Sequence, residues 1–127
     1  MERRAFLAAS AMLGLMGSSA AVAADPARPL YGLIGKMKAV PGQRDALVAA
    51  ILEGSTAMPG CLSYIVAKDA DDADAIWITE VWDSEASHDA SLQLPAVQAS
   101  IAKAKDLVAA VETGVVTVPV GGIGLKA

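Results

Sequence analysis

Four segments of this chain alternate hydrophobic and polar side chains, a pattern that predicts β-strands with one buried face. They span residues 31–40, 61–68, 76–82 and 115–120. In the third, IWITEVW, both alternating sets are largely apolar, so this strand is expected to be covered on both faces. Pro-Gly pairs interrupt the pattern after the first strand and before the second.

Helical spacing of apolar residues dominates between these segments. Residues 43–57 predict one helix. Residues 84–94 predict a second, with Asp83 or Ser84 as its N-cap, and Pro95 suits the first turn of a third. The third helix is expected to end at Gly114, because apolar residues recur before it at the helical positions Val97, Ile101, Ala104, Val108 and Val111.

The predicted order is strand, helix, strand, strand, helix pair, strand. This is the βαββαβ arrangement of a ferredoxin-like α+β domain, in which helices cover one face of an antiparallel sheet. The open face would carry the residues Ile34, Ile65, Trp77, Thr79 and Val81. An exposed apolar face of this size indicates an interface, so we expect a homodimer in which two sheets pack face to face.

The first 24 residues have the features of an export signal. Arg3 and Arg4 precede an apolar run too short to span a bilayer, and small residues lead to an A-x-A cleavage pattern. The adjacent arginines resemble a twin-arginine signal, and an ordinary secretory signal is the alternative. We therefore expect a periplasmic or secreted protein with a signal over 1–24, a leader over 25–30, one domain over 31–120 and a tail over 121–127.

Charge and residue content limit the partners and ligands. The formal net charge of −4 becomes −5 when Glu2, Arg3 and Arg4 leave with the signal, and no basic patch remains. We therefore expect no nucleic-acid partner and, after cleavage, no membrane association. One cysteine, Cys61, and one histidine, His88, are too few for a zinc site of thiolate and imidazole ligands, so no metal site is expected.

The single histidine is the first candidate for chemistry. His88 follows the third predicted strand, and histidine is the side chain whose charge changes near neutral pH. It is therefore a candidate general base. The alternative is a surface histidine that contacts Glu85 or Asp89.

Three further side chains on the predicted strands have two possible roles. Trp82 could stack on a planar substrate or simply fill the core. Tyr64 and Glu80 raise the same question. If Glu80 faces the helices it is buried and needs a partner, for which Arg44 or a lysine is the expected candidate.

Two motifs carry a family resemblance. PGCLSY occupies residues 59–64, and EVWDSEA occupies residues 80–86, with Pro95 after it. In this order and spacing they resemble the antibiotic biosynthesis monooxygenase family of dimeric α/β-barrel proteins. The similarity extends over residues 31–118.

This resemblance implies a cavity between sheet and helices that holds an aromatic substrate. Members of the family oxidise phenolic or quinol compounds with dioxygen, often without a metal or flavin. The implied function is a cofactor-independent monooxygenase whose small-molecule partners are a quinol or related phenol and dioxygen. The alternative is a non-catalytic module of the same fold that binds a hydrophobic small molecule or haem, since fold alone does not define a reaction.

The resemblance also implies site residues. In anthrone-oxidising members, a strand-end tryptophan and an aromatic hydroxyl six residues later correspond to Trp82 and His88. Their asparagine falls on Ile78, and the histidines of many quinol-oxidising members fall on Ser91 and Ala96. The candidate catalytic residues are thus His88 and Trp82, and the candidate substrate-binding residues are Tyr64, Ile78, Glu80 and Ser91.

Overall fold

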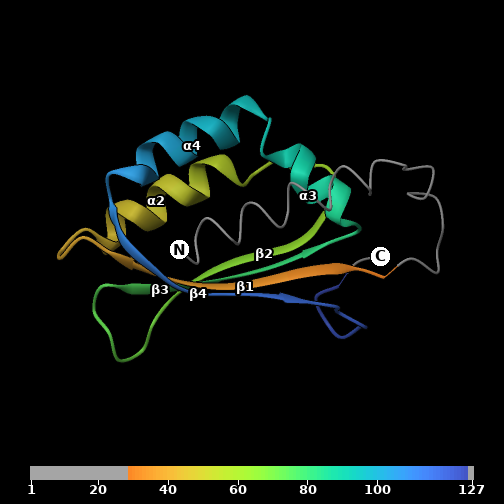
Figure 1. Cartoon of the computed structure of the whole chain (residues 1–127), viewed down its shortest axis with the longest axis horizontal. Coiled ribbons are helices and arrows are strands. Elements are labelled where there is room, and N and C mark those ends of the chain that lie inside the picture. Colours follow the sequence, from red (N-terminus) through yellow and green to blue (C-terminus); the bar gives the residue numbers. More distant parts are fainter. Residues whose placement is uncertain (1–28, 126–127) are drawn as a thin grey trace.

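The computed structural model describes residues 29–125 (Figure 1). In chain order the elements are β1 (Tyr31–Ala39), α2 (Arg44–Gly54), β2 (Cys61–Lys68), β3 (Ala75–Trp82), α3 (Glu85–Ser91), α4 (Pro95–Lys105) and β4 (Val108–Thr117). The predicted export signal at 1–24 and residues 25–28 of the leader lie outside the described residues. Within residues 29–125, no helix is long and apolar enough to cross a membrane.

The strands form one antiparallel sheet in the order β2-β3-β1-β4. All three helices lie on the same face of this sheet (Figure 1). Helices α2 and α4 run side by side, and α3 lies beyond them near the end of β3. The arrangement confirms the ferredoxin-like α+β fold predicted from the sequence.

Local sequence signals set the start of two helices. Ser84 is the N-cap of α3, where its extended backbone lets the hydroxyl accept a hydrogen bond from the Ser87 amide at 3.1 Å. Pro95 occupies the first turn of α4, where its missing N–H has no intrahelical partner to lose. Both positions agree with the sequence prediction.

The predicted extent of the last helix is wrong. Helix α4 ends at Lys105, and both Val108 and Val111 belong to strand β4. The pairing of β4 with β1 shifts register twice, so that Val108 lies opposite Ala39 and Val111 lies opposite Met37. Each shift adds one residue to β4. The inward-facing valines are therefore three residues apart instead of two, which imitates helical spacing.

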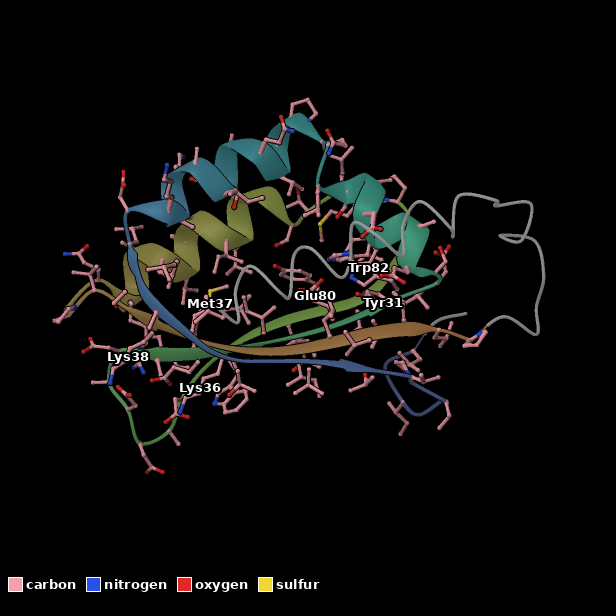
Figure 2. All side chains as sticks on the ribbon, viewed as in Figure 1. Tyr31, Lys36, Met37, Lys38, Glu80 and Trp82 are labelled. Atoms are coloured by element: carbon pink, nitrogen blue, oxygen red, sulfur yellow. The ribbon has the colours of Figure 1, made fainter. Side chains whose placement is uncertain are left out.

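The core consists of two clusters on the helix side of the sheet. The large cluster contains Ala39, Leu47, Ile51, Ile76 and Ile78. The small cluster contains Tyr31, Leu33 and Trp82, with Met58 and Cys61 packed against it. Figure 2 shows Tyr31, Met37, Glu80 and Trp82 on the side of the sheet that faces the helices, and Lys36 on the opposite side.

None of the helices within residues 29–125 covers the outer face of the sheet (Figure 1). Ile34 pairs with Thr79 on one side and with Val115 on the other, and Thr79 also pairs with Ile65. The side chain of Ile65 is 57% exposed and that of Val115 is 46% exposed. By the strand registers, the set predicted for this face shares it: Ile34, Ile65, Trp77, Thr79 and Val81.

Polar contacts cover part of the outer face near the β2–β3 loop. The Trp77 indole N–H donates to Asp69 Oδ1 at 2.8 Å, and Lys36 Nζ lies 5.5 Å from the centre of the Trp77 ring. The indole hydrogen bond is the main reason that the pKa of Asp69 falls to about 2. Arg44 holds the same loop from the helix layer, because its Nη1 donates to the Asp72 carbonyl at 2.8 Å.

Helices α2 and α4 pack closely at Gly54. The Ser100 hydroxyl donates to the Ala50 carbonyl at 2.6 Å, which bonds the two helices directly. A Cβ atom at Gly54 would lie 2.5 Å from the Ser100 Cβ and 2.9 Å from the Ala96 carbonyl oxygen. Neither neighbour is the end of a flexible side chain, so the helices would have to separate.

We predict that Gly54→Ala lowers the free energy of unfolding by about 1–3 kcal/mol, the usual scale of overpacking. Urea denaturation followed by circular dichroism would measure the change. Gly35→Ala is the matched control, since a Cβ there meets nothing closer than the Thr113 carbonyl at 3.5 Å. Equal stability of the two variants would show that the α2–α4 contact is looser than described.

Candidate functional site

A pocket of about 430 Å³ lies between the inner face of the sheet and the helices. Its apolar end lies under α2 and α4 and is lined by side chains that include Met37, Ile51, Val108 and Val111. Its polar end lies toward α3. All six residues predicted from the sequence line this one pocket: Tyr64, Ile78, Glu80, Trp82, His88 and Ser91.

His88 is a buried residue, with 4% of its surface exposed. Its ring lies 5.4 Å from the ring of Tyr31 and 5.4 Å from the ring of Trp82, nearly perpendicular to the latter. The surface location in the alternative prediction is therefore wrong, although the contact with Asp89 that it named is present. These two aromatic rings restrict the positions that the imidazole can adopt, which is a requirement for a positioned base.

When Asp89 is ionised, it selects the tautomer of His88. The distance between His88 Nδ1 and Asp89 Oδ1 is 3.0 Å. An ionised carboxylate can only accept a hydrogen bond, so Nδ1 is the donor and Nε2 is left as the nitrogen that can accept a proton. This contact is made between neighbouring residues on α3.

Glu80 faces the pocket, and its partner differs from the one predicted. The Trp82 indole N–H donates to Glu80 Oε1 at 2.9 Å. Arg44 is directed instead to main-chain carbonyls of the β2–β3 loop, so the predicted Arg44–Glu80 pair is wrong. Burial raises the pKa of Glu80, while the indole hydrogen bond and the nearby His88 oppose this rise.

Tyr64 lies directly opposite Glu80 on the neighbouring strand. Burial is the main cause that raises the pKa of the Tyr64 phenol, and the proximity of Glu80 adds to it. The phenol therefore remains protonated and can donate a hydrogen bond to a substrate oxygen. Tyr64, Glu80 and His88 together place three groups that can bind or transfer protons at the polar end.

The two remaining predicted residues offer less polar chemistry. The Ser91 hydroxyl donates to the His88 carbonyl at 2.6 Å, so toward a ligand it can only accept a hydrogen bond. Ile78 is buried in the large core cluster and presents an apolar surface to the pocket. Ile78 thus forms part of the apolar wall of the pocket, which an apolar ring can contact.

Two carboxyl groups on α3, the helix that carries His88, lie close to each other. Glu85 and Asp89 are one helical turn apart on α3, and Glu85 Oε2 and Asp89 Oδ2 are buried without a hydrogen-bond partner among the described residues. Burial and the charge of Asp89 raise the pKa of Glu85 to about 7, although a hydrogen bond with Tyr31 opposes the rise. Burial likewise raises the pKa of Asp89.

Sequence reasoning missed the residues that hold His88 in place. Tyr31 lies at the start of β1, and only the pairing of Tyr31 with Trp82 in the sheet places it next to the histidine. Asp89 was predicted only as a possible contact of a surface histidine, and not as the partner of Nδ1 in a buried site. Among the described residues, no group of three or more His, Cys, Asp or Glu side chains could hold a metal ion.

Comparison with known proteins gives one family. The family model of the antibiotic biosynthesis monooxygenases matches residues 30–103, more than half of the chain. The chain belongs to this family. A search of functionally curated proteins found no match. Both sequence motifs that carry the resemblance contribute to the pocket. Tyr64 of the first motif lines it, as do Glu80 and Trp82 of the second.

Solved structures support the same family. A protein from Chloroflexus aurantiacus J-10-fl, assigned to the antibiotic biosynthesis monooxygenases, is 63% identical, with a TM-score of 0.75 over 76% of this chain and 99% of that chain. PA3566 from Pseudomonas aeruginosa is 20% identical, with a TM-score of 0.65 over 74% of this chain and 97% of that chain. This lower identity shows a shared fold alone.

The buried carboxyl groups predict how stability depends on pH. The pKa of Glu85 is about 7 in the folded protein, above its ordinary value of 4.5. The folded state therefore binds more protons between these values, and stability should fall as the pH rises through this range. Glu80 and Asp89, whose pKa values are also raised, contribute in the same direction.

We predict that Glu85→Gln reduces this decline and has a Tm a few degrees above that of the natural protein at pH 8, with a smaller difference at pH 5. Thermal melts at both pH values would measure it. Asp71→Asn, which removes an exposed carboxylate that makes no ion pair or side-chain hydrogen bond with the described residues, controls for loss of charge alone. An unchanged decline in Glu85→Gln would mean that Glu85 ionises freely in the folded state.

Proposed function

We propose that this protein is a monooxygenase that oxidises a quinol or a related phenol with dioxygen and needs no metal or flavin. The observation that carries the proposal is the buried His88, whose Nδ1 bonds to Asp89 and which lines an apolar pocket beside Tyr64 and Glu80. A base enclosed by aromatic rings at the end of an apolar pocket suits an aromatic hydroxyl compound.

The reaction begins with removal of a proton from the substrate. Nε2 of His88 accepts the hydroxyl proton, and the Tyr64 phenol can donate a hydrogen bond to the resulting phenolate. The electron-rich phenolate transfers an electron to dioxygen, and the two radicals combine to form a peroxide at a ring carbon. Loss of water from the peroxide leaves a carbonyl group.

The electrons balance without a further reductant. One quinol and one dioxygen give one hydroxyquinone and one water, because the substrate supplies all four electrons that dioxygen accepts. Glu80 is a second group able to hold a proton, since burial raises its pKa. The Glu80 carboxyl group can supply the proton that the oxygen atom leaving as water needs. The Trp82 indole N–H meanwhile holds Oε1 of Glu80 in place.

We predict that His88→Ala lowers the rate of oxygen uptake about 10²-fold or more, the usual scale for loss of a positioned base. The loss should be larger for a weakly acidic phenol than for an easily ionised quinol, because the former depends more on the base. Oxygen-electrode measurements with both substrate types would test this. Gln93→Ala, at an exposed position just after α3, is the control.

Full activity of His88→Ala on the weakly acidic phenol would contradict the role of His88.

A second function has support in the apolar lining of the pocket: a non-catalytic module that holds a hydrophobic molecule or haem. Binding of quinones without oxygen uptake in the natural protein would favour that function. For haem, His88 is the residue that would hold the iron, through Nε2.

We also propose that the protein is a homodimer closed by the outer faces of two sheets. Support comes from the row of apolar side chains on this face, of which Ile65 and Val115 are about half exposed. Exposed apolar faces of this kind usually mark interfaces. In a dimer of this kind the pocket remains on the helix side of each sheet.

We predict that Ile65→Asp yields a monomer, because burial of an unpaired carboxylate at the interface is unfavourable. Ile65 is already 57% exposed in the single chain, so the variant should fold. Sedimentation analysis would determine the mass. Leu52→Asp, at a 46% exposed position in the helix layer, is the matched control and should remain a dimer. A dimeric Ile65→Asp protein would show that the outer face is not the interface.

A further inference from the structure

Strand β1 has a gap in its row of inward-facing side chains. Tyr31 and Leu33 belong to the small core cluster, and Met37 packs against the large one. Gly35 lies between them with the same orientation, lines the pocket and has no side chain. The pocket therefore occupies the space between the two clusters, where a side chain at position 35 would otherwise join them.

The backbone does not require glycine at this position. Gly35 is absent from the glycines with positive φ, and a Cβ there would meet only the Thr113 carbonyl, at an ordinary 3.5 Å. A glycine inside a central strand weakens the strand and often marks a place where a ligand approaches the backbone. Gly114 lies opposite Gly35 on β4, so the bare part of the sheet extends across two strands.

The strand register relates this gap to the polar groups. Glu80 pairs with Leu33 on β1 and with Tyr64 on β2. We call this row of the sheet the polar row, because it carries Glu80 and Tyr64. The next inward-facing row is Ile78 with Gly35, two residues along the strand and therefore about 7 Å away. A single aromatic ring whose hydroxyl binds at the polar row stops short of Gly35, whereas a fused second ring extends over it.

We propose that Gly35 is a specificity-determining residue of this pocket, because its bare backbone accommodates the second ring of a fused aromatic substrate whose hydroxyl binds near Tyr64 and His88. This inference rests on the proposed function, in that the pocket is the substrate site. A methyl group at position 35 occupies the place of the second ring. It leaves the polar row unchanged.

The test compares the binding of 2-naphthol and phenol, which have two rings and one ring and do not need to be turned over. Isothermal titration calorimetry should show that Gly35→Ala lowers the ratio of naphthol affinity to phenol affinity at least tenfold, and Gly35→Val lowers it further. Ala102→Val, which adds volume at an exposed position of α4, should leave the ratio unchanged. Gly35→Ala should keep or raise the Tm, which excludes unfolding as the cause.

Three outcomes distinguish this inference from the proposed function. A ratio that is unchanged in Gly35→Ala overturns the inference, and so does a natural protein that binds neither compound. A ratio that falls in Gly35→Ala supports it, even if no quinol is oxidised. If the ratio falls and the natural protein oxidises no quinol, the pocket binds fused aromatic rings as described and the proposed oxidation is wrong.

Discussion

The pairing of β1 with both β3 and β4 is the constraint on which the rest of the structure depends. Because β1 is central, its register determines which side chains meet on the inner face of the sheet. It places Tyr31 beside Trp82 and Gly35 beside Ile78. A slip of one residue would turn these side chains to the outer face and remove both the core and the pocket.

The same register leaves polar groups in an apolar environment, where they need partners. Glu80 receives the indole hydrogen bond of Trp82, and His88 bonds to Asp89. At Glu85, whose Oε2 has no hydrogen-bond partner within residues 29–125, burial raises the pKa of the carboxyl group. The polar end of the pocket therefore combines groups that can hold protons with a surrounding wall of apolar side chains. This combination reduces stability, and buried titratable groups of this kind are typical of functional sites.

The two register shifts between β1 and β4 have a further effect. They space the inward-facing residues of β4 three apart, at Val108, Val111 and Gly114. This spacing explains why the sequence pattern resembled a helix there. It also means that the side of the pocket formed by β4 is built from short side chains.

Much of the fold follows from the sequence alone, since period-two alternation, Pro-Gly turns and the Ser84 cap act locally. These features identified β1, β2 and β3, the start of α3 and α4, and the inward orientation of Glu80 and Trp82. The last strand was predicted at residues 115–120, but its observed extent, Val108–Thr117, was not, because the spacing of its first half depends on how β4 pairs with β1. The contacts of His88 with Tyr31 and Trp82, and the partner of Glu80, likewise depend on residues brought together by strand pairing. Sequence patterns determine which face a side chain occupies, and only the tertiary structure decides which neighbours it meets there, since those neighbours come from other strands and helices.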